Sequence, residues 1–284
     1  MKIYNRRYLG NKTKLLSFIT DVINQECGQF NSIFDAFAGT GSVMSAFLDK
    51  QIITNDILYS NYISHIAWFQ NSSFDKKKIE GMIEQYNNLP NDLLDNYVSL
   101  NFANTYFSEN VCKKIGHIRE DIEVQFINNN INEKERAILI TSLLYAMDKI
   151  ANTCGHYDAW RKGVEYTEDF AIQPLEVFAN TSKKNKFFNM DTNELAPKIK
   201  CDIVYLDPPY NSRQYCDAYH LLENIAKWEK PVVEGTARKM NRDNLKSEYC
   251  KRTAANAFEA EQYLSQRLRN QAASSLWICN EANG

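Results

Sequence analysis

The sequence predicts an α/β protein built on an open, mostly parallel sheet. Short apolar runs with an acid at or near their end recur along the chain, at 32–37 (SIFDAF), 51–56 (QIITND), 186–191 (KFFNMD) and 202–207 (DIVYLD). Each run is typical of a parallel strand covered by helices on both faces, because such a strand is apolar almost throughout. Helical patterns lie between the runs, at 42–50 (SVMSAFLDK) and 192–198 (TNELAPK). Open sheets of this kind bind ligands at the carboxyl ends of their strands, so we expect a site there.

Composition places the chain among ordinary soluble proteins. Its 284 residues are 44% hydrophobic, which is enough for a sizeable core in one large domain or in a core with a smaller companion. We expect a cytoplasmic protein, because no apolar run approaches the ~20 residues of a membrane span and the N-terminus lacks a signal peptide. The seven scattered cysteines form no CxxC pair and lie near no histidine cluster, so we expect reduced thiols and no metal site.

The middle of the chain, from Phe74 to Asn185, loses the strand patterns and becomes helical. The clearest helix is expected at 133–151, where one stripe carries Ala137, Ile140, Leu143, Leu144, Met147 and Ile150. This helix should anchor a separate helical subdomain. The segment that follows it, 151–163 (ANTCGHYDAWRKG), has no apolar period and is predicted to be a functional loop.

A glycine-rich turn follows the first strand in the stretch FDAFAGTGSV. Asp35 ends the strand, Gly39 and Gly41 form the turn, and a helix is expected to start at Ser42. Glycines let a ligand approach the backbone closely, although simple tight packing of strand and helix explains such a turn equally well. A dinucleotide fingerprint would need a third glycine where Met44 stands, so we expect no pyrophosphate.

Two further acids stand at successive strand ends. Asp56 follows the glycine turn by about twenty residues, the position from which an acid bonds ribose hydroxyls. Asp191 is placed to meet an adenine ring. Each acid alone is more often a helix N-cap, but together they predict a pocket for an adenosine without phosphates.

The fourth strand ends in the motif Asp207-Pro208-Pro209-Tyr210. The prolines fix φ and remove two N–H donors, so the loop is stiff and presents acceptors. Asp207 and the Pro208 carbonyl can accept both hydrogens of an amino group, and Tyr210 can stack on a planar base. Such acceptors free the lone pair of an exocyclic amine, and the base must first leave the duplex. A loop that merely caps a strand would explain the two prolines alone.

These motifs resemble those of the adenine-specific DNA methyltransferases of bacterial restriction-modification systems, closest to the FokI-type enzymes. The resemblance covers most of the chain and is most specific at 207–231 (DPPYNSRQYCDAYHLLENIAKWEKP), while 6–16 (RRYLGNKTKLL) and 151–160 (ANTCGHYDAW) are also similar. It implies a Rossmann-like S-adenosylmethionine-dependent methyltransferase fold. The implied divisions are a cofactor part at 1–73, a helical target-recognition insert at 74–185 and a catalytic part at 186–284.

The resemblance also implies roles for single residues. The residues assigned to S-adenosylmethionine are Tyr8, Gly10, Lys12, Asp35, Phe37, Gly39, Gly41, Asp56 and Asp191. Those assigned to the target adenine are Asp207, Pro208, Pro209 and Tyr210. Contacts to the backbone of double-stranded DNA are expected from Arg213, Tyr215, His220 and the basic residues after Thr236, namely Arg238, Lys239, Arg242, Lys246, Lys251 and Arg252. A solvated helical face would explain this basic run equally well.

The chain ends at Gly284 soon after a predicted strand at 275–279 (SLWIC), whereas the family continues with further strands. We therefore expect the last two or three strands to be missing, with an open sheet edge that a second polypeptide could complete. Three alternatives stay open: a remnant that binds cofactor or DNA without turnover, a methyltransferase for RNA adenine or cytosine N4, and one for protein glutamine.

Overall fold

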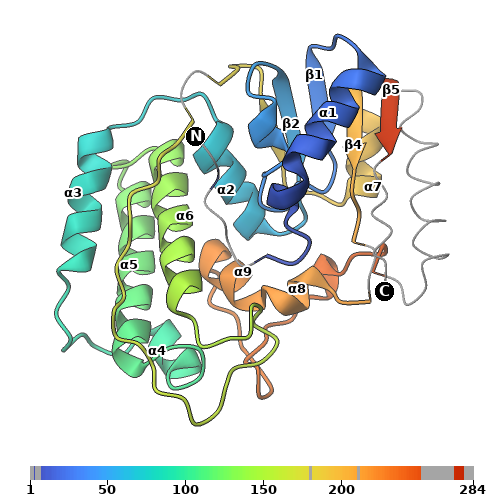
Figure 1. Ribbon diagram of the computed structural model, residues 1–284. Helices are drawn as coiled ribbons and strands as arrows, with labels where there is room; N and C mark the ends of the chain where they lie inside the picture. The colour runs from blue at the N-terminus through green and yellow to red at the C-terminus, as the bar shows by residue number, and fades with distance from the viewer. Residues whose placement is uncertain (1–2, 4–7, 179–180, 210–211, 251–271, 278–284) are drawn as a thin grey trace.

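The computed structural model describes residues 3, 8–178, 181–209, 212–250 and, for the backbone alone, 272–277. It contains a five-stranded sheet in which every strand pair is parallel and the order is β3-β2-β1-β4-β5. The strands are β1 (Ser32–Asp35), β2 (Gln51–Asn55), β3 (Lys186–Phe188), β4 (Cys201–Leu206) and β5 (Ala272–Trp277). Figure 1 shows helices packed around this sheet and a helical layer to one side of it. The predicted α/β class is confirmed.

The central strand, β1, explains why the apolar runs are continuous. Its four residues are all buried, and Ile33 pairs with Ile52 of β2 and with Ile203 of β4. The third predicted strand is shorter than expected. Because β3 ends at Phe188, Asp191 lies beyond the sheet.

The described helices are mostly short near the sheet and long in the insert. They are η1 (Lys12–Leu15), α1 (Leu16–Cys27), η2 (Met44–Ala46), α2 (Tyr59–Phe69), α3 (Lys76–Asn87), α4 (Tyr97–Phe102), α5 (Glu109–Ile127), α6 (Glu133–Ile150), α7 (Thr192–Leu195), η3 (Ala196–Lys198), α8 (Tyr215–Ala218), α9 (His220–Lys227) and η4 (Asp243–Leu245).

The helix predicted at 42–50 is wrong, because only the single turn η2 forms there. The hydroxyl of Ser45 donates to the carbonyl of Ser42 (2.6 Å), and such bonds compete with the helical ladder. The pattern at 192–198 forms α7 and η3 in place of one longer helix.

The helix predicted at 133–151 is confirmed as α6, which begins with a capping box between Asn132 and Glu135. The stripe from Ala137 to Met147 is buried, but so is most of the opposite side of the helix. The reason is that α6 packs against α2 on one side and α5 on the other. One apolar cluster joins residues of α2, α3, α5, α6 and α9. The insert thus shares its core with helices next to the sheet, and its division from them at 74 and 185 stays a prediction.

Two buried cations tie the insert to its neighbours. The ammonium of Lys134, on α6, donates to the carbonyls of Ile66, Ala67 and Gln70 at the end of α2 (2.8–3.0 Å). The guanidinium of Arg119, on α5, donates in the same way to the last carbonyls of α9. Each cation satisfies carbonyls that a helix end leaves without an intrahelical partner.

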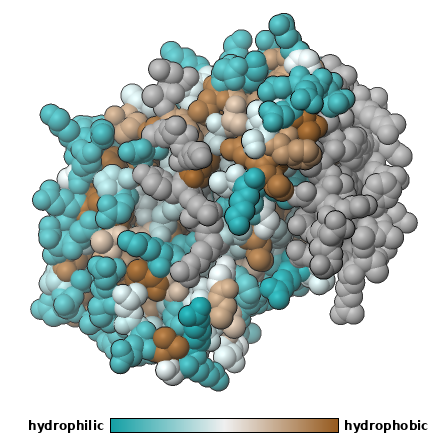
Figure 2. Space-filling view, viewed as in Figure 1, coloured by the Kyte–Doolittle hydropathy of each residue, from teal (hydrophilic) through white to brown (hydrophobic). Residues whose placement is uncertain are grey.

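The described surface is mixed in character. Figure 2 shows hydrophilic residues over α3 and apolar ones near α1, where Phe18 is 59% exposed. None of the described helices combines the length and apolar content that a bilayer span needs.

Candidate active site

A pocket opens at the carboxyl ends of β1, β2 and β4. Because β2 and β4 lie on opposite sides of β1, the pocket lies where the strand order reverses, the usual ligand site of open α/β sheets. Most of the residues predicted for the site line this pocket. They are Tyr8, Gly10, Lys12, Asp35, Phe37, Gly39, Asp56, Asp191, Asp207, Pro208, Pro209 and, unexpectedly, Tyr215. Tyr210 lies outside the described residues.

Asp56 joins the end of β2 to the glycine turn. Its carboxylate accepts hydrogen bonds from the backbone N–H of Gly39 and from that of Leu58, both at 2.8 Å. The side chain is only 8% exposed, and burial raises its pKa to about 7. Asp56 thus shapes the turn while it lines the pocket.

The two glycines of the turn differ in what they do. Gly39 lines the pocket with a φ of +52°, and a Cβ there would lie 3.2 Å from the ring of Tyr8. Gly41 is not among the residues that line the pocket, so its assignment to the cofactor stays a prediction. With a φ of +77°, it would place a Cβ 2.9 Å from the ring of Phe69, so it permits the turn to pack against α2.

Asp207 forms an ion pair at the end of β4. Its Oδ2 lies 2.8 Å from Nζ of Lys12, and the two side chains are 14% and 8% exposed. Burial raises the pKa of Asp207 above its ordinary value, and the Lys12 ammonium opposes that rise. Lys12 therefore favours the charged, accepting form of a carboxylate whose burial favours the neutral form.

The pocket is strongly acidic. Asp35, at the end of β1, is buried, and its burial raises its pKa well above the ordinary value, with Asp207 and Asp56 adding to the rise. The carboxylates of the described lining are Asp35, Asp56, Asp191, Asp207 and Glu248, against the single ammonium of Lys12. Such a lining suits a cationic ligand and repels phosphates.

Comparison with known proteins places these features in a family. Residues 8–273 match the model of the D12 class N6 adenine-specific DNA methyltransferases. The chain belongs to this D12 methyltransferase family.

Several curated relatives are similar along most of this chain. Modification methylase StsI of Streptococcus sanguinis is 37% identical over 86% of the chain and 39% of its own length. Type II methyltransferase M.FokI of Planomicrobium okeanokoites is 34% identical over 89% and 42%. Type II methyltransferase M.NlaIII of Neisseria lactamica is 33% identical over 87% and 76%. The chain thus spans about two fifths of the length of the StsI and FokI enzymes.

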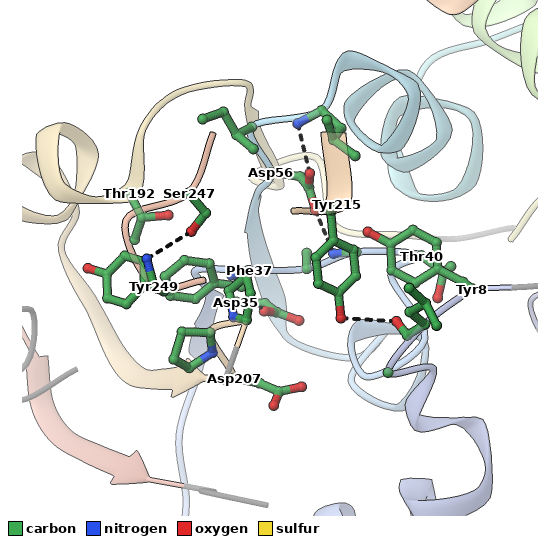
Figure 3. Close-up of a pocket in the computed structure, with 18 of the residues that line it drawn as sticks. Tyr8, Asp35, Phe37, Thr40, Asp56, Thr192, Asp207, Tyr215, Ser247 and Tyr249 are labelled. Atoms are coloured by element: carbon green, nitrogen blue, oxygen red, sulfur yellow. Dashed lines mark hydrogen bonds between the residues drawn. The ribbon is translucent and has the colours of Figure 1, made fainter. Parts of the chain in front are cut away.

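The D12 pocket has aromatic walls at two ends. Figure 3 shows Asp35 between two aromatic pairs in this view, Phe37 with Tyr249 and Tyr8 with Tyr215. The rings of Phe37 and Tyr249 meet edge to face, with centroids 5.0 Å apart.

Sequence reasoning missed the wall formed by Leu245, Ser247, Glu248 and Tyr249. The side-chain amide of Gln214 holds this wall, because it accepts from the N–H of Ser247 (2.8 Å) and donates to its carbonyl (3.0 Å). Gln214 follows the DPPY motif closely, and that was the one signal that could have drawn attention to it.

Asp191 does two things at once. Its carboxylate accepts from the N–H of Asn193 (2.7 Å) as the N-cap of α7, and it also lines the D12 pocket. The cap and the proposed adenine contact are therefore compatible.

Two residues predicted to contact DNA lie elsewhere. Tyr215 lines the pocket. His220 is 1% exposed, its Nε2 lies 2.8 Å from the carbonyl of Tyr157, and burial lowers its pKa to about 4. His220 is thus a core histidine, because α9 packs against both α2 and α6.

The basic side chains of the segment after Thr236 mostly form ion pairs with carboxylates. Lys239 pairs with Asp158 (2.7 Å) and Asp217 (3.2 Å), and Arg242 pairs with Asp217 (2.5 Å). Three other predicted cations lie in the described residues. Arg213 is exposed, and its Nη1 lies 3.3 Å from Nε2 of His156. Lys246 pairs with Asp243 at 2.6 Å, and Arg238 is exposed. Lys251 and Arg252 lie outside the described residues.

Proposed function

We propose that this D12 protein transfers a methyl group from S-adenosylmethionine to the N6 amino group of a flipped adenine in double-stranded DNA. The observation that carries this proposal is the shared pocket. The Asp207 carboxylate, held by Lys12, opens into the same space as the Gly39 turn and Asp56.

The residues of the pocket fit the proposed methyl donor. S-adenosylmethionine carries a sulfonium and no phosphate, which agrees with the acidic lining. Asp56 would hold the ribose hydroxyls, Asp191 and Phe37 the adenine ring, and the segment from Tyr8 to Lys12 the methionine end. When bound, the cofactor supplies an electrophilic methyl group.

The chain would act on the target amine through electrostatics. The Asp207 carboxylate and the Pro208 carbonyl would each accept a hydrogen bond from the amine. These bonds draw the nitrogen lone pair out of conjugation with the ring. The new N–C bond forms as the S–C bond breaks, and the nitrogen then loses one proton. As an acceptor of a hydrogen bond from the amine, Asp207 would take that proton. Lys12 favours the ionised carboxylate throughout.

One further expectation, a cytoplasmic location, stays a prediction. The insert supports a duplex substrate over RNA, because it offers the additional surface that reading a specific sequence requires.

The test is a methylation assay followed by nucleoside analysis. The purified chain is incubated with plasmid DNA or RNA and S-adenosylmethionine, and N6-methyladenine is measured in the digested DNA. Asp207→Ala should lower kcat on the order of a hundredfold or more, because a main acceptor is lost in a dry site. Its affinity for S-adenosylmethionine, measured by calorimetry, should stay near that of the unmodified protein.

Other results would select other functions. Modified cytosine or modified RNA would change the acceptor, and cofactor binding without turnover would indicate a remnant. Equal turnover by Asp207→Ala would remove Asp207 from the chemistry.

A further inference from the structure

Both polar backbone groups of Leu9 are bound by tyrosines that follow the DPPY loop. The N–H of Leu9 donates to the hydroxyl of Tyr219 (2.6 Å), and its carbonyl accepts from the hydroxyl of Tyr215 (3.2 Å). The two tyrosines are four residues apart, since Tyr215 is the first residue of α8 and Tyr219 is its C-cap, so they lie on one side of that turn. The hydroxyls of Tyr215 and Tyr219 therefore both hydrogen-bond to Leu9, which lies about two hundred positions earlier in the sequence.

The chain from Leu9 to Lys12 is a short turn that links the two tyrosine hydrogen bonds to the buried Lys12. Gly10 has a φ of +72°, and a Cβ there would lie 2.9 Å from the hydroxyl of Tyr215. Asn11 then caps η1 by accepting from Thr13 (2.9 Å), and Lys12 is the first residue of η1. The position of Leu9 thus sets where the ammonium of Lys12 meets Asp207.

Tyr8 extends the same contact toward the glycine turn. Its ring stacks on Tyr219 with centroids 4.6 Å apart and an interplanar angle of 14°. Its hydroxyl accepts from the amide of Asn61 (2.9 Å), and its ring lies against Gly39. The N-terminal segment therefore contacts the cofactor side of the pocket and the segment after DPPY together.

We propose that Tyr215 and Tyr219 are positioning residues that hold Leu9, and through it Lys12, against Asp207. The proposal rests on the proposed methyl transfer. In this role, α8 connects the part of the site that would bind the methyl donor with the part that would bind the target base.

Loss of the two tyrosine hydrogen bonds to Leu9 would change the electrostatic surroundings of Asp207. The described charged and titratable groups that face Asp207 are Lys12 from η1, Asp35 from β1 and Tyr205 from β4. Lys12 is the one among them that favours the ionised carboxylate. If Lys12 moves away, the pKa of Asp207 rises, and a protonated carboxyl accepts the amine hydrogen less well.

The test removes the two hydroxyls and keeps the rings, in the double variant Tyr215→Phe/Tyr219→Phe. We expect kcat to fall about ten- to a hundredfold, as for a small misplacement of a reacting group. The KM for S-adenosylmethionine should change less than kcat. The acidic limb of the kcat–pH profile should move to higher pH, because a larger share of Asp207 is protonated at each pH.

A second measurement needs no turnover. Lys12 is buried and ion-paired, so acetic anhydride should acetylate it slowly in the unmodified protein and several times faster in the double variant, as peptide mass spectrometry would show. Tyr86→Phe is the matched control, since it deletes a buried tyrosine hydroxyl bonded to Asp121 far from the pocket. It should change neither the pH profile nor the acetylation of Lys12.

The two proposals fail in different ways. An unmodified protein that methylates nothing would overturn the proposed function, while faster acetylation of Lys12 in the double variant would still support the positioning role. Unchanged Lys12 acetylation, or an unshifted pH limb in an active double variant, would show that the tyrosines serve stability alone.

Discussion

Asp56 serves both the fold and the proposed cofactor site. A carboxylate has about four acceptor positions, and the N–H groups of Gly39 and Leu58 occupy two of them. The side chain of Asn61 also hydrogen-bonds this carboxylate, which leaves about one acceptor position for a ribose hydroxyl. A structural cap and a ligand contact are therefore not alternatives at this position, contrary to the choice that the sequence alone presents.

The pKa of Asp56 gives a pH test of this dual role. Burial raises the pKa to about 7, so the side chain gains its negative charge as pH rises through neutrality. An ionised Asp56 accepts more strongly and attracts the cationic donor, so affinity for S-adenosylmethionine should rise between pH 6 and 8. Calorimetric titration across this range checks it. Asp56→Asn should bind more weakly and flatten the rise, whereas an equally steep rise in that variant would assign the titration to another group.

The position of a residue at the pocket could be predicted where it follows from the order of the strands along the chain. Asp56, Asp191 and Asp207 were found because each stands at or just beyond a strand end, and these ends meet at one edge of a parallel sheet. Tyr249 was missed because tertiary contacts alone, among them the bonds of Gln214 to Ser247, bring its segment over the pocket. No periodicity encodes such an approach.

At the scale of elements, the segment from Glu234 to Tyr249 shows that the number of basic residues in a sequence does not give the charge that remains unpaired in the fold. Glu234 and Lys239 pair through both backbone hydrogen bonds (2.9 Å each), which places Arg238 at a turn. Lys239 meets Asp158, 81 residues earlier in the sequence. A run that is basic in sequence is therefore largely neutralised in the fold.

The different surroundings of Arg238 and Lys239 lead to a prediction of how DNA affinity depends on salt concentration. Arg238 is exposed, so Arg238→Gln should reduce the slope of log K against log [salt] by about 0.9 if it contacts one phosphate. Lys239→Gln should lower thermal stability and leave the slope nearly unchanged, because Lys239 already has two carboxylate partners. Fluorescence anisotropy with a labelled duplex measures both slopes. An equal loss of slope in the two variants would show that the Lys239 pairs open on DNA.

At the scale of the whole molecule, the strands were predictable because burial on both faces makes them continuously apolar, and the long helix α6 because its apolar stripe recurs at the helical period. The order of the strands and the partners of the helices were not, since they depend on contacts between distant segments. The boundaries near 74 and 185 mark a change of pattern, yet one apolar cluster crosses them. The buried cations Lys134 and Arg119 cross them as well.

The shared core predicts a single unfolding transition. In urea, tryptophan fluorescence should coincide with far-UV circular dichroism, since Trp68 lies in α2 and Trp228 follows α9, on both sides of the insert. A fragment of residues 74–185 should not unfold cooperatively alone, because α6 would expose the face that packs on α2. Two separated transitions, or a cooperatively folded fragment, would contradict this.

The central place of β1 also has a consequence for biosynthesis. One neighbour, β2, follows it closely, but the other, β4, is made about 165 residues later, which at ordinary translation speeds is roughly ten to thirty seconds. Throughout that interval one edge of β1 has no native partner, and its apolar residues Ile33 and Phe34 can pair with other extended chains. The nascent protein is therefore most exposed to misassembly before β4 emerges from the ribosome, and it depends on whatever shields that edge until then.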